Sequence, residues 1–209
     1  MMEIVMTTKA SANTLVPEFK STDPYSWLSG NNNYELPAEW LGLLADVPEK
    51  HSARILASID EESFARYAMF VNTVFEDPEH GLLSLAEREF IGVVVSSINA
   101  CVTCLIIHTH RLGKYIGDHS RARRIAINYR TVSLSEQERA IADFAVKITE
   151  QPGKLEAADL QKLREVNLSD AKIFYVIEIA AMYNFTNRIM SAYGMRPDDE
   201  FMAEIAPDG

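Results

Sequence analysis

The chain has 209 residues, a formal net charge of −10 and an ordinary apolar fraction of 47%. A chain of this length typically forms one domain whose core needs no cross-links. The acidic balance argues against non-specific binding to nucleic acid, no apolar run is long enough to cross a bilayer, and residues 1–11 lack the charged start and apolar block of a secretory signal. We therefore expect a cytoplasmic protein that has no nucleic-acid or membrane partner.

Residues 1–36 are mostly polar and rich in turn-forming residues, and they predict an extended N-terminal arm ahead of a single domain over 37–209. The arm has one hydrophobic anchor, formed by Tyr25, Trp27 and Leu28. This anchor is expected to pack either on its own domain or on a partner subunit.

From residue 37 onward the apolar residues recur at helical spacing, and no pair of strands is indicated. The sequence therefore predicts an all-α domain. The expected helices cover 38–44, 49–59, 61–75, 84 to a break near 99, about 100–112, 119–129, 135–150, 157–165 and 169–190. Within the last helix, 173–183 is apolar nearly all round, which is typical of a central buried helix or of one that faces another subunit.

Two helix starts resemble each other. Ser84 with Glu87 and Ser135 with Glu138 both have capping-box spacing, and residues 83–88 resemble 134–139. Either a duplicated helical unit or two ordinary capping boxes would give this pattern.

The stretch 101–108 contains the only two cysteines of the chain, Cys101 and Cys104, followed by His108. In a chain without a secretory signal, this spacing indicates redox or metal chemistry. At about 100° per residue all three side chains share one face of a helix. With Asn99 as the N-cap, both cysteines lie near the positive end of the helix dipole, which favours thiolate.

Other interpretations of the cysteine pair are weaker. Two small buried hydrophobic residues would be unusual in a chain that uses cysteine nowhere else. Zinc would need Cys101, Cys104, His108 and His110 as ligands, but His110 lies on the opposite face of the helix. Covalent haem attachment needs a histidine directly after the second cysteine, where Leu105 stands. We therefore expect neither a metal nor an organic cofactor.

The preceding helix adds a carboxylate. If the two helices form an antiparallel hairpin that turns near residues 99–100, Glu89 and His108 lie at heights that match within about one turn, at roughly 1.5 Å per residue. A carboxylate that faces an imidazole orients the ring and raises its basicity. We predict that Glu89, His108 and the two thiols form one site.

The other histidines, His51, His80 and His119, have no evident partner in the sequence. A lone histidine is more often structural than functional, and we expect these three at the surface.

Eleven residues separate Glu89 from Cys101, and Cys104 and His108 follow. With this spacing the sequence resembles the AhpD-like alkylhydroperoxidases of the carboxymuconolactone decarboxylase superfamily. Longer stretches resemble one branch, the uncharacterised peroxidase-related enzymes. These stretches are 83–91, 97–101, 163–169 and 184–188. The resemblance covers about 39–201 and leaves out the arm.

The resemblance implies an all-α homo-oligomer: a dimer, a trimer or a hexamer. It also implies that Cys104 attacks a hydroperoxide, that Cys101 resolves the resulting sulfenic acid to a disulfide, and that Glu89 and His108 relay protons. A dithiol reductant, such as a lipoyl or thioredoxin-like protein, would reset the pair. Relatives of this kind carry a further histidine just before the second cysteine, where this chain has Thr103, so part of the relay is missing or replaced.

Helix-dipole reasoning alone makes Cys101 the more acidic and more exposed thiol. The family resemblance gives the attack to Cys104, and we follow it. The expected function is thiol-dependent hydroperoxide reduction, an antioxidant peroxidase activity. The alternatives are a decarboxylase or lactone-type enzyme of the same superfamily and a non-enzymatic redox-sensing protein.

Overall fold

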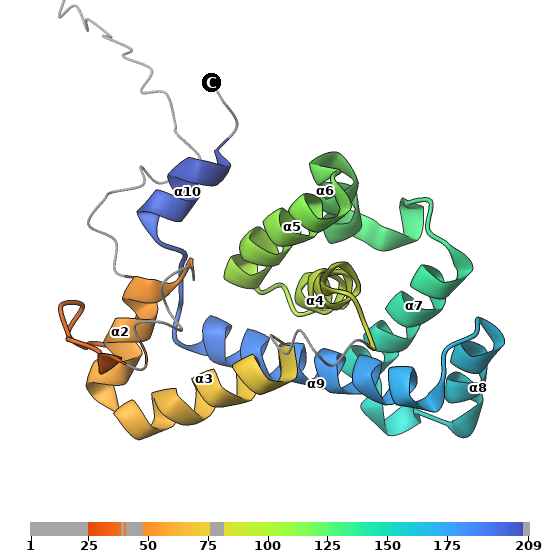
Figure 1. Cartoon of the computed structure of the whole chain (residues 1–209), viewed down its shortest axis with the longest axis horizontal. Coiled ribbons are helices and arrows are strands. Elements are labelled where there is room, and N and C mark those ends of the chain that lie inside the picture. Colours follow the sequence, from red (N-terminus) through yellow and green to blue (C-terminus); the bar gives the residue numbers. More distant parts are fainter. Residues whose placement is uncertain (1–24, 39, 41–47, 76–81, 207–209) are drawn as a thin grey trace, which may run out of the picture.

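The computed structural model describes residues 25–38, 40, 48–75 and 82–206, and Figure 1 shows the arrangement. These residues form helices and connecting segments, with no strand among them. The helices are α2 (Lys50–Ile59), α3 (Glu61–Phe75), α4 (Leu85–Ile98), α5 (Val102–Ile116), α6 (His119–Asn128), α7 (Glu136–Glu150), α8 (Ala157–Glu165), α9 (Asp170–Ala192) and α10 (Asp199–Ile205), with short 3₁₀ turns at Tyr129–Thr131 and Pro152–Lys154. The expected all-α fold is confirmed.

Helix α4 is the centre of the molecule and packs against α5, α6, α7 and α9 (Figure 1). Its side chains are buried on every face from Arg88 to Ser96, and Ile91, Val93 and Val94 have no exposed surface. A helix that is enclosed all round needs apolar or small residues on each face, and α4 has them. The main core therefore forms around α4, which fixes the position of Glu89 within it.

The described part of the arm is tied to the domain through its backbone. Trp27 N donates to Tyr193 O at 2.7 Å, and Arg196 N donates to Tyr25 O at 3.2 Å. The side chains of Trp27 and Leu28 are 75% and 47% exposed. Tyr25 is therefore the most buried of the three anchor residues, and the Trp27 ring lies against Gly194. The packing of the anchor on a partner subunit stays a prediction.

Several expectations fall wholly or mostly outside the described residues: the arm up to residue 24, most of the helix expected over 38–44, and His80. Both capping boxes, at Ser84 and Ser135, are present. None of the helices in the described ranges has the length and apolarity needed to cross a membrane.

The end of one helix differs from the prediction, and one helix was not predicted. Helix α5 continues past Gly113 to Ile116 and ends at Gly117, whose φ of 67° is the left-handed conformation that terminates helices. Gly113 lies inside the helix, and its missing side chain lets His119 of α6 pack against it. The short helix α10 was not expected, although Asp198 as N-cap and two acidic residues in the first turn are typical of a helix start.

Candidate active site

The turn between α4 and α5 sets the position of Cys101. Ala100 has a φ of 52°, Ala100 N donates to Ser97 O at 3.2 Å, and Cys101 N donates to Ser96 O at 3.1 Å. This pair of hydrogen bonds is a Schellman motif, which closes α4 and reverses the chain. Asn99 was expected to begin the second helix. It is instead the C-cap of α4, and Cys101 is the N-cap of α5.

Cys101 and Cys104 are joined by a disulfide and are 1% and 4% exposed. Cys104 is the third residue of α5, where the helix dipole favours a thiolate. The sulfurs pack in a small apolar cluster with Met190, Tyr193 and Met195. Helix-dipole reasoning predicted that Cys101 is the more exposed of the two. The two residues are in fact buried to a similar degree, so exposure does not distinguish them.

A surface cavity of about 260 Å³ opens on this cluster. Its wall includes Cys101, together with Trp27 of the arm and Met190 and Met195 from the end of α9 and the segment after it. None of the described residues that line it is charged. The cavity gives the disulfide an uncharged approach from solvent on the Cys101 side.

Glu89 and His108 meet, as the hairpin geometry requires. Glu89 Oε2 lies 2.7 Å from His108 Nδ1, and Glu89 is completely buried. Tyr183 of α9 adds a second contact, since its hydroxyl lies 3.1 Å from the same nitrogen and its ring packs edge-on against the imidazole. A carboxylate, when ionised, can only accept a hydrogen bond. The shared hydrogen then belongs to Nδ1 of His108, and the lone pair of the ring is on Nε2. His108 lies one turn after Cys104 on the same helix face.

Arg111 and Glu49 lie next to the Glu89–His108 pair. Arg111 Nη1 lies 3.9 Å from Glu89 Oε1, an oxygen that accepts no hydrogen bond from the described residues. Glu49 Oε2 is likewise buried without a hydrogen-bond donor in the described part of the chain. Burial raises the pKa of the Glu49 carboxyl, and the nearby charges of Arg111 and His108 only partly counteract this. The arrangement therefore places two carboxylates, each with one buried oxygen that accepts no hydrogen bond from the described residues, beside one arginine.

Thr103 occupies the position where relatives have a histidine. It is 6% exposed, and its hydroxyl donates to the backbone oxygen of Met195. This contact holds the segment after α9 against the start of α5. Thr103 thus has a structural partner and is not directed toward the Glu89–His108 pair.

His110 lies apart from the cysteines, as the helical wheel indicates. Its ring is 5.3 Å from that of His119 and 5.6 Å from that of Phe201. The pKa of His110 is lowered, mainly by burial and to a smaller extent by the neighbouring His119. The four-ligand zinc arrangement considered for the cysteines is therefore not assembled in this structure. His119 is exposed as expected, whereas His51 is half-buried and bonded to Asn32, which corrects the surface prediction for that residue.

Three members of the site were not predicted from the sequence: Tyr183, Arg111 and Glu49. Arg111 was detectable, because it follows His108 by three residues and so shares its helix face. Tyr183 stands in a stretch that the hydrophobic pattern describes only as apolar. Glu49 begins α2, and nothing in the sequence connects α2 with α5.

No protein-family profile and no curated protein matches the chain. Solved structures do match it. An uncharacterised peroxidase-related protein from Silicibacter sp. TM1040 is 28% identical, with a TM-score of 0.75 over 87% of this chain and 96% of that one. A second, from Ralstonia eutropha JMP134, has an alkylhydroperoxidase AhpD core; it is 26% identical, with a TM-score of 0.76 over 89% of this chain and 100% of that one. This chain belongs to the AhpD-like superfamily.

More distant AhpD-like folds carry other chemistry. The debrominase Bmp8, solved as a cysteine-to-alanine variant in complex with 2,3,4-tribromopyrrole, is 15% identical, with a TM-score of 0.62 over 80% of this chain and 87% of that one. At this identity the similarity concerns the fold alone. The reaction of this chain therefore has to be inferred from its own site residues.

Proposed function

We propose that this AhpD-like protein is a thiol-dependent hydroperoxide reductase. The observation that carries the proposal is the 2.7 Å contact between Glu89 and His108, one helical turn from a cysteine pair that forms a disulfide. A thiolate, an oriented base and a second thiol are the groups that the reaction needs. The peroxidase-related relatives agree with it.

In the proposed cycle the Cys104 thiolate attacks the distal oxygen of a hydroperoxide. The O–O bond breaks, Cys104 becomes a sulfenic acid, and the leaving alkoxide takes a proton managed by His108. The Cys101 thiol then attacks the sulfenic sulfur, which forms the disulfide and releases water. An external dithiol reduces the disulfide by exchange, so that one hydroperoxide and one dithiol give one alcohol, one water and one oxidised dithiol.

Glu89 acts through His108. It holds the Nδ1 side of the ring, so that Nε2 serves as the base, and Tyr183 limits the rotation of the imidazole. The cavity on the Cys101 side supports attack by the reductant at the Cys101 sulfur, with Cys104 leaving as the thiolate that the helix dipole favours.

The test is the consumption of cumene hydroperoxide with dithiothreitol as the reductant. We expect Cys104→Ser to abolish turnover, and Cys101→Ser to leave a sulfenic acid on Cys104 that dimedone traps. His108→Asn and Glu89→Gln should each lower kcat/KM by about 10²-fold, the lower range for a lost acid–base group. His110→Asn is the matched control on the opposite helix face and should keep the wild-type rate. Full activity in Cys104→Ser would rule out the mechanism.

A redox-sensing role is the second candidate, because both cysteines are 4% exposed or less. Buried thiols react slowly with peroxide, and a sensor needs a large structural response rather than rapid turnover. If the wild-type protein does not accelerate peroxide loss over dithiothreitol alone, but changes its oligomeric state on oxidation, the sensor replaces the peroxidase.

A further inference from the structure

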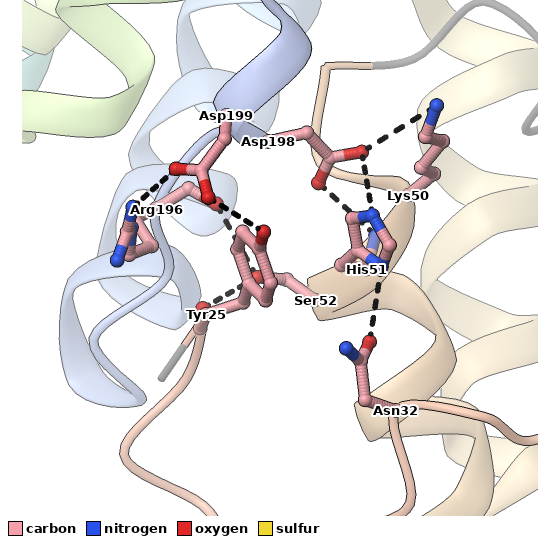
Figure 2. A network of polar contacts seen from close by, with 8 residues as sticks. All are labelled: Tyr25, Asn32, Lys50, His51, Ser52, Arg196, Asp198 and Asp199. Carbon is pink, nitrogen blue, oxygen red and sulfur yellow. Dashed lines mark hydrogen bonds and ion pairs between the residues drawn. The ribbon is translucent and has the colours of Figure 1, made fainter. Parts of the chain in front are cut away.

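A second polar cluster lies where the arm, the start of α2 and the start of α10 meet (Figure 2). It contains His51 from α2, Asp198 from the segment before α10, and Glu200 from the first turn of α10. Each of these side chains offers one ligand atom, and these atoms all lie within 4.8 Å of one another. No step of the proposed peroxide reaction uses them.

Asp198 is the most buried residue of the cluster. Its side chain is 2% exposed. Its Oδ1 accepts a hydrogen bond from His51 N at 3.1 Å, and its own backbone N donates to Pro48 O at 2.6 Å. The second oxygen, Oδ2, accepts no hydrogen bond from the described residues although it is buried. A buried carboxylate oxygen without a donor is costly unless a cation approaches it.

The imidazole of His51 faces this oxygen. Asn32 Oδ1 lies 3.1 Å from His51 Nδ1, so Nδ1 carries the hydrogen and Nε2 presents its lone pair (Figure 2). His51 Nε2 lies 3.9 Å from Asp198 Oδ2. Metal-binding histidines commonly have such a hydrogen bond on the other ring nitrogen, because it fixes the tautomer and the ring orientation. The ring is also stacked on Tyr25, with centroids 4.7 Å apart.

We propose that His51, Asp198 and Glu200 bind a divalent transition-metal ion such as Zn²⁺. One imidazole and two carboxylates suit this class of ion better than Ca²⁺ or Mg²⁺, which prefer oxygen ligands alone. Tetrahedral ligands about 2.1 Å from zinc are about 3.4 Å apart, so Nε2 and Oδ2 need to approach by only about half an ångström. Water would supply the remaining position.

Lys50 competes with the ion. Its Nζ lies 4.0 Å from the same Oδ2, and the side chain is 38% exposed, so it can swing into solvent when a metal enters. The bound ion would connect α2 with α10 and thus stabilise the segment that follows α9.

The experiment is calorimetric titration of ZnCl₂ into the full chain, treated with chelator and kept without reductant so that the Cys101–Cys104 disulfide stays closed. A thiol assay verifies that no free thiol contributes. We expect one zinc site, about 10-fold or greater loss of affinity in His51→Asn and in Glu200→Gln, and tighter binding in Lys50→Met. At a zinc concentration of about 100 times the Kd, the wild-type Tm should rise by about 5–10 °C.

Two controls separate this site from other zinc ligands. Glu204→Gln makes the same charge change on the same helix outside the cluster, and His119→Asn removes the histidine beside His110. Both should bind zinc as the wild type does. The proposal is overturned if the wild type binds no zinc, if Glu200→Gln and Glu204→Gln behave alike, or if only His119→Asn loses binding. These outcomes are independent of peroxidase activity.

Discussion

Glu49 and Glu89 each have a buried carboxylate oxygen, but their surroundings differ. Glu89 has His108 at 2.7 Å, whereas Glu49 Oε2 accepts no hydrogen bond from the described residues. The Glu49 carboxyl also contributes to the raised pKa of the Tyr67 hydroxyl, which is mainly an effect of burial. Burial of the Glu49 carboxyl raises its pKa, so the protein disfavours the charge of this residue.

Replacing Glu49 by Gln should therefore stabilise the protein at neutral pH. The pKa of Glu49 is raised from its ordinary value of 4.5, so between the two values the folded state binds more protons than the unfolded state. The free energy of unfolding of the wild type then falls as pH rises through this interval and stays lower above it. We expect Glu49→Gln to be the more stable protein at pH 7 in urea denaturation, with the advantage disappearing below about pH 4.5.

Glu62→Gln is the control for this effect. The Glu62 side chain is 92% exposed on α3, and its removal should change stability by less than about 0.5 kcal/mol at either pH. A Glu49→Gln protein that is less stable than the wild type at pH 7 would mean that Glu49 is charged and stabilised by Arg111.

At the scale of elements, the close approach of α4 and α9 positions His108. Gly92 of α4 faces the end of the Tyr183 ring, and a Cβ at this position would overlap that ring. Tyr183 is 1% exposed and cannot move into solvent. The absence of a side chain at Gly92 thus lets the Tyr183 hydroxyl reach His108 from the neighbouring helix.

Gly92→Ala should lower the free energy of unfolding by about 1–3 kcal/mol, the usual cost of overpacking, although alanine favours helices. It should also lower peroxidase kcat, because Tyr183 would be displaced from His108. Urea denaturation measures the first effect. Gly153→Ala is the matched control, since a Cβ there meets no atom within 4 Å, and it should leave stability within about 0.5 kcal/mol. Equal stability of the two variants would contradict the packing argument.

At the scale of the whole molecule, α9 has one buried and one exposed face. Phe174 and Phe185 are 66% and 43% exposed and, being eleven residues apart, lie within about 20° of the same direction on the helix. Phe70 of α3 packs edge-on against Phe185, with ring centroids 5.4 Å apart. Exposed apolar patches of this kind mark association surfaces. We propose that this face, defined by Phe70, Phe174 and Phe185, forms the contact between subunits.

Phe185→Ser should therefore reduce the oligomeric state, as measured by size-exclusion chromatography with light scattering. The loss of an aromatic anchor from the centre of an interface commonly costs about 2 kcal/mol or more, and roughly a 30-fold weaker association would follow. Ile127→Ser on α6 is the control, because Ile127 is 82% exposed but lies on a different surface. A wild type that is monomeric would show the oligomer prediction wrong, and an unchanged mass for Phe185→Ser would exclude this face.

Local patterns in the sequence were enough to predict α2 to α9, apart from the exact ends, and the first members of the site. Capping boxes at Ser84 and Ser135 begin α4 and α7 as predicted, because a cap is made by residues only three apart. The spacing of Cys101, Cys104 and His108 along one helix, and the hairpin that brings Glu89 to them, depend only on helix rise and rotation. The same patterns indicated which superfamily the chain belongs to.

The tertiary structure decided the rest. Tyr183 contacts His108 across 75 residues of sequence, and Asp198 meets His51 across 147. The helical periodicity of the sequence predicts neither contact. Each contact depends on how α9 and the segment after it pack on α4 and α2. By itself, the sequence determined which groups are available for chemistry and which helices carry them. Burial and long-range packing, which arise only when the helices assemble, decided which of these groups meet and which carboxylate oxygens accept no hydrogen bond from the described residues.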